Sequence, residues 1–179
     1  MAALEAPERF RAVVAIDIPH PGALRPSLST AWSMRHFLLF QLRGPSVRWL
    51  TRGNCKGVSK LWRRWSPNWS FDDADLAPIR RCFEDREAAG AAIDYYRSFM
   101  GDQRGEAGRA LKKLLRTPGQ APTLAITGDS GPVGVDDFRR SERYHEGKWE
   151  LLVVPGAGHF VHREAPEAVV EKMLAFLDT

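Results

Sequence analysis

Three short runs of apolar residues, each followed by a turn, predict three buried strands in this chain. They cover residues 12–16, 122–127 and 149–154. Runs of this length that are rich in Val, Ile and Leu and bounded by Pro or Gly are typical of strands in parallel sheets. Apolar residues recur at helical spacing between and after these runs. Strands that alternate with helices predict an α/β fold with parallel pairs.

The stretch between the first two strands is helical in pattern and rich in aromatic residues. Leu61, Trp62 and Trp65 have a spacing that places them on one helix face. A further helix is expected over residues 88–100, closed by Gly101 and followed by a loop over residues 101–108. The whole block is therefore predicted to be a helical insertion between two strands of one sheet.

Two more helices are expected in the last third of the chain. Residues 135–147 are mostly charged, which predicts a surface helix. A final amphipathic helix is expected over residues 166–177, with Pro166 in its first turn. Its buried side is predicted to contain Val169, Val170, Met173, Leu174 and Leu177.

Composition places the chain among globular proteins with one core. It has 179 residues, of which 44% are hydrophobic and 27% are charged, and no apolar run approaches the length of about 18 that predicts a membrane span. Glu5 and Glu8 lie where a signal peptide would be basic and then apolar, so we expect a cytoplasmic protein. Cys55 and Cys82 have no zinc-type spacing; they are expected to be ordinary thiols, with a single disulfide left open.

The positive charge of the chain is concentrated in one segment. The net charge is +4, and residues 18–71 contain nine basic and no acidic residues. Five of the nine recur every four residues: Arg48, Arg52, Lys56, Lys60 and Arg64. This spacing predicts a solvated stripe on a helix that is interrupted near Gly53 and Gly57; the alternative is a rim that attracts anions. No nucleic-acid-binding motif accompanies the stripe, so no nucleic-acid partner is expected.

Polar residues follow each predicted strand, where open α/β sheets usually place their sites. The candidates are Asp17 with His20, then Asp129, then His159. His159 carries the strongest signal, because a strand precedes it, a helix follows it and the turn before it contains Gly156 and Gly158. His162 lies three residues further on, but two histidines without a third ligand are a weak metal site. We therefore expect no metal and no cofactor.

The segment Gly156-x-Gly158-His159-Phe160-x-His162-x-Glu164-x-Pro166 resembles the histidine loop of α/β-hydrolase-fold enzymes, in the epoxide hydrolase and haloalkane dehalogenase branch. Residues 14–21 resemble the strand that leaves the core for the cap, and residues 124–129 resemble the strand and turn that present the catalytic acid. The resemblance implies a partial α/β-hydrolase fold. Its expected parts are a core strand and exit over 1–24, a helical cap over 25–117 and C-terminal core strands and helices over 118–179.

The resemblance also implies roles for individual residues. His159 would be the general base and Asp129 the acid that orients it; because the turn after Gly128 is short, Asp136 and Asp137 remain alternatives. Tyr96 corresponds to a cap tyrosine that donates a hydrogen bond to an epoxide oxygen; it could equally be a core aromatic residue. Where a second such tyrosine is expected, this chain has His36 or an apolar neighbour.

No G-x-S-x-G or G-x-D-x-G turn, the usual place of the nucleophile, occurs in the sequence. The implied function is hydrolysis of a small apolar organic substrate through a covalent intermediate, in a chain that lacks its own Asp or Ser nucleophile. Two explanations for the missing nucleophile turn remain open: the chain is a gene fragment, or it is a degenerate member of the family. The alternative function is a non-catalytic remnant that binds a small molecule. A sheet without its neighbouring strands would also expose an edge that favours self-association.

Overall fold

The protein was analysed as a computed structural model that describes residues 2–25, 28–101 and 105–178. A parallel sheet of three strands forms one part of it, in the order β1 (Val13–Ile16), β2 (Thr123–Gly128) and β3 (Trp149–Val154). Val13 pairs with Thr123, which pairs in turn with Trp149. The three predicted strands are confirmed to within one residue at each end.

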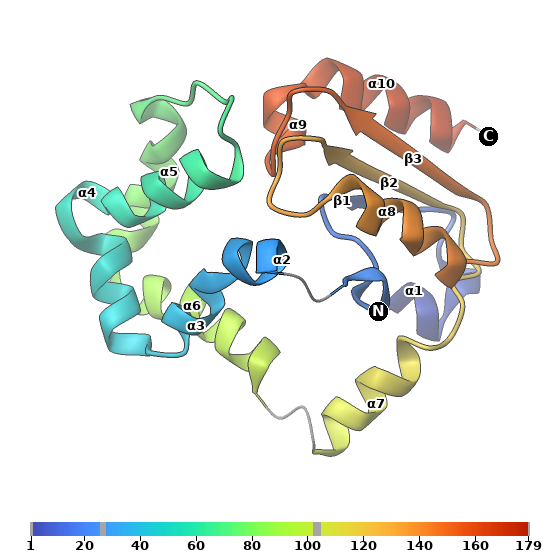
Figure 1. Cartoon of the computed structure of the whole chain (residues 1–179), viewed down its shortest axis with the longest axis horizontal. Helices are drawn as coiled ribbons and strands as arrows, with labels where there is room; N and C mark the ends of the chain where they lie inside the picture. The colour runs from blue at the N-terminus through green and yellow to red at the C-terminus, as the bar shows by residue number, and fades with distance from the viewer. Residues whose placement is uncertain (1, 26–27, 102–104, 179) are drawn as a thin grey trace.

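Helices cover both faces of the sheet. In Figure 1, α9 (Val161–Glu164) and α10 (Pro166–Leu177) lie above it and α8 (Val135–Ser141) lies below it. Apolar side chains of β2 pack with Val169 and Phe176 of α10. The prediction for α10 is wrong in part, since Val170 is 52% exposed and Leu174 is 59% exposed. The buried stripe of α10 passes through Phe176 instead.

The charged segment after β2 is more buried than its composition predicts. It forms α8 and then a 3-10 turn, η3 (Glu142–Tyr144). Phe138 of α8 is fully buried, and Asp137 and Ser141 are buried beside it. One apolar ring therefore anchors this otherwise polar helix to the sheet.

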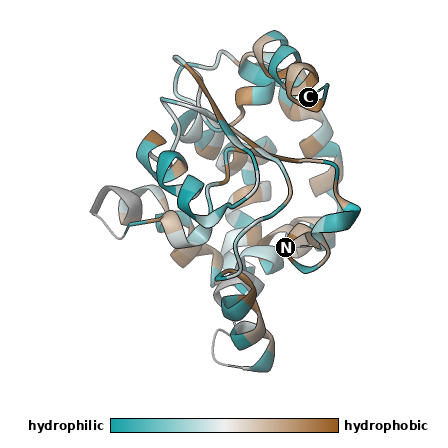
Figure 2. Ribbon diagram, turned by 90° about the vertical axis from the view of Figure 1, so that its right-hand side faces the viewer, coloured by the Kyte–Doolittle hydropathy of each residue, from teal (hydrophilic) through white to brown (hydrophobic). Residues whose placement is uncertain are grey.

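Five helices form a separate block on the left of Figure 1: α2 (Leu28–Ser33), α3 (Arg35–Phe40), α4 (Arg43–Trp65), α5 (Asp73–Glu84) and α6 (Arg86–Met100). The block has a hydrophobic core of its own, in which Phe40, Leu61, Trp62 and Ile93 are buried. Figure 2 shows hydrophobic residues along the strands, while the helices carry both kinds of residue. Apolar side chains of α3, α4 and α6 therefore pack against one another.

The basic stripe lies on a broken helix, as predicted. The backbone of α4 leaves helical geometry over residues 52–55, where Gly53 has a φ of 59°. Gly57 packs so closely that an added Cβ would lie 2.5 Å from the carbonyl oxygen of Trp49. Arg48, Arg52, Lys56 and Lys60 are exposed, as a solvated face requires, whereas Arg64 is half-buried.

The connection between α6 and β2 differs from the prediction. Gly101 caps α6 as expected, but residues 106–108, predicted to be loop, begin the helix α7 (Glu106–Leu114). Residues 102–104 of the predicted loop lie outside the described residues. Short helical turns α1 (Ala2–Glu5) and η1 (Pro7–Arg9) precede the sheet. Together, α1 and α7 lie near the lower end of the strands (Figure 1).

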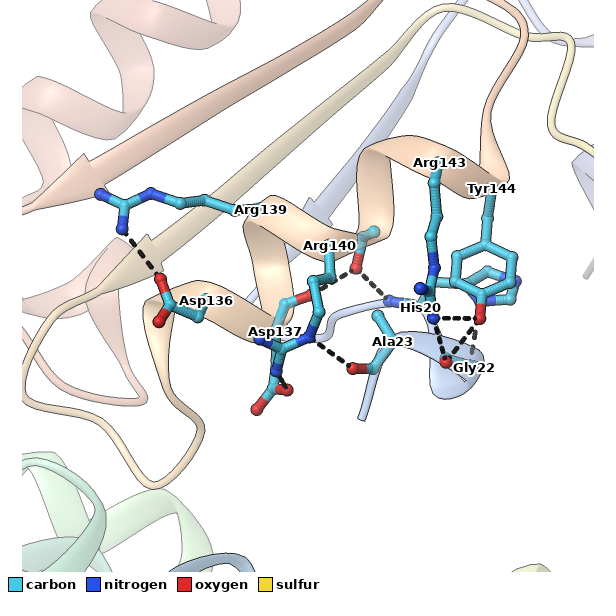
Figure 3. A network of polar contacts seen from close by, with 10 residues as sticks. His20, Gly22, Ala23, Asp136, Asp137, Arg139, Arg140, Arg143 and Tyr144 are labelled. Carbon is cyan, nitrogen blue, oxygen red and sulfur yellow. Dashed lines mark hydrogen bonds and ion pairs between the residues drawn. The ribbon is translucent and has the colours of Figure 1, made fainter. Parts of the chain in front are cut away.

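The chain leaves β1 through a segment that is fastened to α8 and η3 (Figure 3). Gly22 lies in the turn η2 (Pro21–Ala23), and its carbonyl accepts a hydrogen bond from the hydroxyl of Tyr144 at 2.5 Å. The amide of His20 donates to the hydroxyl of Ser141 at 2.9 Å, and the His20 ring stacks on Tyr144. These contacts fix the direction in which the chain leaves the sheet.

Across the described ranges, no helix combines the length and the apolar character needed to cross a membrane. Both cysteines are free thiols: Cys55 is buried and Cys82 is exposed.

Candidate active site

His159 and Asp17 meet at the end of the sheet where the strands finish. Asp17 directly follows β1, and His159 lies in the loop after β3. Nδ1 of His159 lies 2.5 Å from Oδ2 of Asp17, within hydrogen-bond distance. A carboxylate bound to one ring nitrogen holds the imidazole in one orientation and leaves the other nitrogen for chemistry. An imidazole held in this way can accept a proton through its free nitrogen.

Asp17 is held in an unusual backbone conformation at a buried position. Its φ is +51°, a region that Asp reaches more readily than most residues, and it is 3% exposed. The hydroxyl of Thr127, on β2, donates to Oδ1 of Asp17 at 2.7 Å, which leaves Oδ2 for His159. Burial raises the pKa of the Asp17 carboxyl above 3.8, against the lowering effect of its contacts with His159 and Thr127.

The structure places Asp17, and not the expected Asp129, against the imidazole of His159. Asp129, the expected partner of His159, accepts hydrogen bonds from the amide of Gly156 at 2.7 Å and from the Ser130 hydroxyl at 3.0 Å. The alternatives Asp136 and Asp137 each pair with an arginine one turn further along α8, as Figure 3 shows. Asp129 therefore holds the histidine loop in place, and the carboxylate bound to the imidazole is Asp17.

The loop that carries His159 is fastened to the helical block through Glu164. One carboxylate oxygen of Glu164 accepts from the Ser66 hydroxyl at 2.6 Å and from the Phe160 amide at 3.1 Å. The other oxygen accepts from the Gly158 amide at 2.8 Å. Gly158 allows this approach, because an added Cβ would lie 2.5 Å from the Cα atom of Ser66. Core and helical block are thus joined directly beside the imidazole.

Aromatic side chains from the helical block surround the imidazole. The amide of His159 donates to the carbonyl of Trp65 at 2.9 Å, and the two rings meet edge to face at 5.2 Å. The Trp65 ring in turn lies 5.1 Å from that of His36, which lies 5.8 Å from the ring of Tyr96. Burial raises the pKa of the Tyr96 hydroxyl above 10.0, so at neutral pH it remains protonated and able to donate a hydrogen bond.

The remaining candidate residues do not join this site. Nδ1 of His20 accepts from the amide of Gly22 at 3.1 Å, which keeps His20 in the segment that leaves β1. His162 is exposed on α9. No group of three His, Cys, Asp or Glu side chains suited to a metal ion occurs among the residues that the structure describes.

Several residues of the site carry little signal in the sequence. Thr127 ends the second predicted strand, and its hydroxyl orients Asp17 only because β1 and β2 are neighbours in parallel register. Ser66 is visible in the sequence only as the residue before a proline. Glu164 falls within the histidine-loop pattern. That pattern does not indicate that its carboxylate contacts both Ser66 and the loop backbone.

Comparison with solved structures identifies the fold. A protein of Nostoc that is classed provisionally as an α/β hydrolase matches 98% of this chain with a TM-score of 0.80 at 22% identity. A protein of Klebsiella pneumoniae, classed provisionally as an epoxide hydrolase, matches 99% with a TM-score of 0.76 at 21% identity. An epoxide hydrolase of Bacillus megaterium, solved with an inhibitor, matches 99% with a TM-score of 0.75 at 19% identity.

This chain has a partial α/β-hydrolase fold. It spans 60% of the Nostoc protein, 63% of the Klebsiella protein and 64% of the Bacillus enzyme. No model of a protein family matches the sequence, and no curated protein matches it.

Proposed function

We propose that this chain carries the base and the acid of a hydrolase in the epoxide hydrolase-like branch of the α/β-hydrolase fold. The contact between His159 Nδ1 and Asp17 Oδ2 supports this most directly. His159 removes a proton from a water molecule through its other ring nitrogen, and Asp17 stabilises the imidazolium that forms. The activated water then breaks a covalent intermediate between the substrate and a nucleophile.

In this proposal the nucleophile is an Asp or Ser supplied by residues outside the sequence described here. The absence of a nucleophile turn from the 179 residues and the 60–64% span of the matched structures support it. In the proposal, the strand that carries the nucleophile would pair with the side of β1 that faces away from β2, because β1 is an edge strand of the sheet that the described residues form.

The proposed substrate is a small apolar organic molecule, with an epoxide as the first class to test. The rings of Trp65, Phe40 and Tyr96 make the surroundings of His159 and His36 apolar. The Tyr96 hydroxyl would donate a hydrogen bond to the epoxide oxygen as the ring opens, because negative charge develops on that oxygen. His36 lies beside Tyr96, where a second donor would act.

The test joins this chain, from Val13 onward, to the segment of the Bacillus megaterium enzyme that leads into its strand equivalent to β1. We call this chimera the joined protein. We expect it to hydrolyse styrene oxide, while this chain alone turns over epoxides, esters and haloalkanes no faster than its His159→Ala variant. Turnover by the chain alone that disappears in His159→Ala would contradict the need for an external nucleophile.

A second candidate function is a binding module without catalysis, favoured by the tryptophan-rich helical block. Titration of the tryptophan fluorescence with aromatic ligands, together with turnover by the joined protein, separates the two. Saturable binding by a joined protein that is folded but inactive would favour the binding module. A flat response would exclude it.

We also propose self-association, because within the described ranges no strand pairs with the side of β1 that faces away from β2. Backbone groups on an unpaired strand edge are a template for another strand. Sedimentation velocity over a range of concentrations should show dimers or larger species that disappear in Ala15→Lys, which places a charge on the edge strand. A single monomeric species at every concentration would contradict this proposal.

A further inference from the structure

One member of the basic stripe, Arg64, departs from the solvated face and turns toward the candidate active site. It is half-buried, whereas the other four members are exposed. Its Nη2 lies 3.2 Å from Nδ1 of His36. Its Nε is buried with no hydrogen-bond partner in the described parts of the chain, and no carboxylate there forms an ion pair with it. Nδ1 of His36 is therefore a hydrogen-bond partner of a guanidinium that is partly withdrawn from water.

Nδ1 of His36 has two neighbours, of which one requires a proton on Nδ1 and the other requires a lone pair there. The carbonyl of Ser33 lies 3.1 Å away and could only accept a proton from Nδ1. Arg64 carries only donors, so it requires a lone pair on Nδ1. A hydrogen bond from a charged donor is about twice as strong as one between neutral groups. A proton on Nδ1 would also face the guanidinium directly, so the contact with Arg64 prevails.

The surroundings keep the imidazole neutral. His36 is 8% exposed, and its ring touches those of Phe40, Trp65 and Tyr96. The nearby charged or titratable groups are Arg35 on its own helix, Arg64 on α4, Tyr96 on α6 and His159 on the loop after β3. Burial first, and Arg64 second, lower the pKa of His36 from 6.5 to about 4. At neutral pH the ring carries one proton, on Nδ1 or on Nε2.

We propose that Arg64 is a positioning residue that donates to Nδ1 of His36, keeps the ring proton on Nε2 and thereby makes His36 a hydrogen-bond donor beside Tyr96. The role of that donor rests on the proposed function: His36 Nε2–H and the Tyr96 hydroxyl together stabilise negative charge that develops on the substrate. The tautomer itself does not depend on the proposed function. His36 would thus replace the second tyrosine without needing to be charged.

The test is nitrogen NMR of the full chain labelled with 15N-histidine, in which protonated and unprotonated ring nitrogens give separate signals. His36 is assigned by the loss of its signals in His36→Asn. We expect Nε2 to be protonated and Nδ1 unprotonated at neutral pH. In Arg64→Met the proton should move to Nδ1, where the Ser33 carbonyl accepts it. Arg64→Lys should restore the original tautomer, since its ammonium also donates.

Arg63→Met is the matched control, because Arg63 is the exposed neighbour of Arg64 and should leave the His36 signals unchanged. A wild-type Nδ1 that carries the proton would overturn the inference, and so would a folded Arg64→Met with the original tautomer. If Arg64→Met does not fold, the position of the ring proton of His36 in the wild type still tests the inference.

The same spectrum reports the tautomer of His159. The contact of His159 with Asp17 requires the opposite tautomer, with the proton on Nδ1. Failure at His159 alone would count against the proposed function and leave the role of Arg64 intact.

Discussion

Nδ1 of His159 lies 2.5 Å from Oδ2 of Asp17, although 142 residues separate them in the chain. The contact spans the sheet, because Asp17 follows β1 and His159 lies in the loop after β3, with β2 between the two strands. Thr127 at the end of β2 completes the arrangement by donating to the other carboxylate oxygen. The end of β2 and the segments that follow β1 and β3 therefore each contribute one side chain to the same small network.

Asp17→Asn should abolish most of the activity of the joined protein. An asparagine amide donates toward Nδ1 and would force the imidazole into the wrong tautomer, a change that costs on the order of 10⁴-fold in kcat where a triad acid is replaced. Asp129→Asn is the matched control, because Asp129 contacts the loop backbone and not the imidazole. A larger loss for Asp129→Asn than for Asp17→Asn in styrene oxide hydrolysis would return the role of acid to Asp129.

Asp17→Asn should also stabilise the chain at neutral pH. The pKa of Asp17 is raised in the folded state, so the folded chain binds more protons than the unfolded chain as the pH rises above about 4. The free energy of unfolding of the wild type therefore decreases as the pH rises above about 4. The asparagine of the variant does not titrate, so the variant does not lose stability in this way. Thermal unfolding at pH 4 and pH 7 should show a larger advantage for the variant at pH 7. An advantage that shrinks toward pH 7 would contradict the direction of the pKa shift.

Tyr96→Phe should lower epoxide opening by roughly 10²- to 10³-fold, the usual cost of removing one donor to a developing oxyanion. Stability should change little, since the ring and its contacts with Phe37 and Phe40 remain. Tyr95→Phe serves as the control, because Tyr95 is 74% exposed on the same helix. Equal rates of styrene oxide hydrolysis in both variants would make Tyr96 a core aromatic residue, the alternative that its sequence position leaves open.

Glu164→Gln should loosen the histidine loop from the helical block. Glutamine has one acceptor oxygen in place of two, so part of the network with Ser66, Gly158 and Phe160 is lost. Hydrogen bonds to a charged group contribute about 1.5–3 kcal/mol each, and we expect a loss of that order in the free energy of unfolding from urea titration. Glu171→Gln, at an exposed position of α10, should change it by less than about 0.5 kcal/mol. Similar losses in the two variants would show that the network does not stabilise the fold.

The elements set by local pattern were predictable from the sequence. The three strands, the helix that begins at Pro166 and the place of His159 all follow from short-range periodicity and from glycines around a turn. The carboxylate that contacts His159 was not predictable in this way, because Asp17 and Asp129 both follow a strand. The choice depends on the positive φ of Asp17 and on the Thr127 hydroxyl, which only the packed sheet brings together.

The inward position of Arg64 also depends on tertiary structure that the local sequence pattern does not indicate. Spacing alone groups it with Arg48, Arg52, Lys56 and Lys60, because a regular helix would keep all five on a slowly drifting stripe. The break over residues 52–55 changes the direction of α4. The last member of the stripe can then reach His36, which comes from a different helix.

The proposed function requires His159 to act on a covalent intermediate, and intact-mass spectrometry of the joined protein tests this most directly. After incubation with styrene oxide, the His159→Ala form should carry one substrate adduct that persists, because attack by the nucleophile still occurs while hydrolysis of the intermediate stops. The form that retains His159 should turn over the epoxide and accumulate little adduct. A His159→Ala form that hydrolyses styrene oxide as fast as the form with His159, and carries no adduct, would contradict the assignment of His159 as the base.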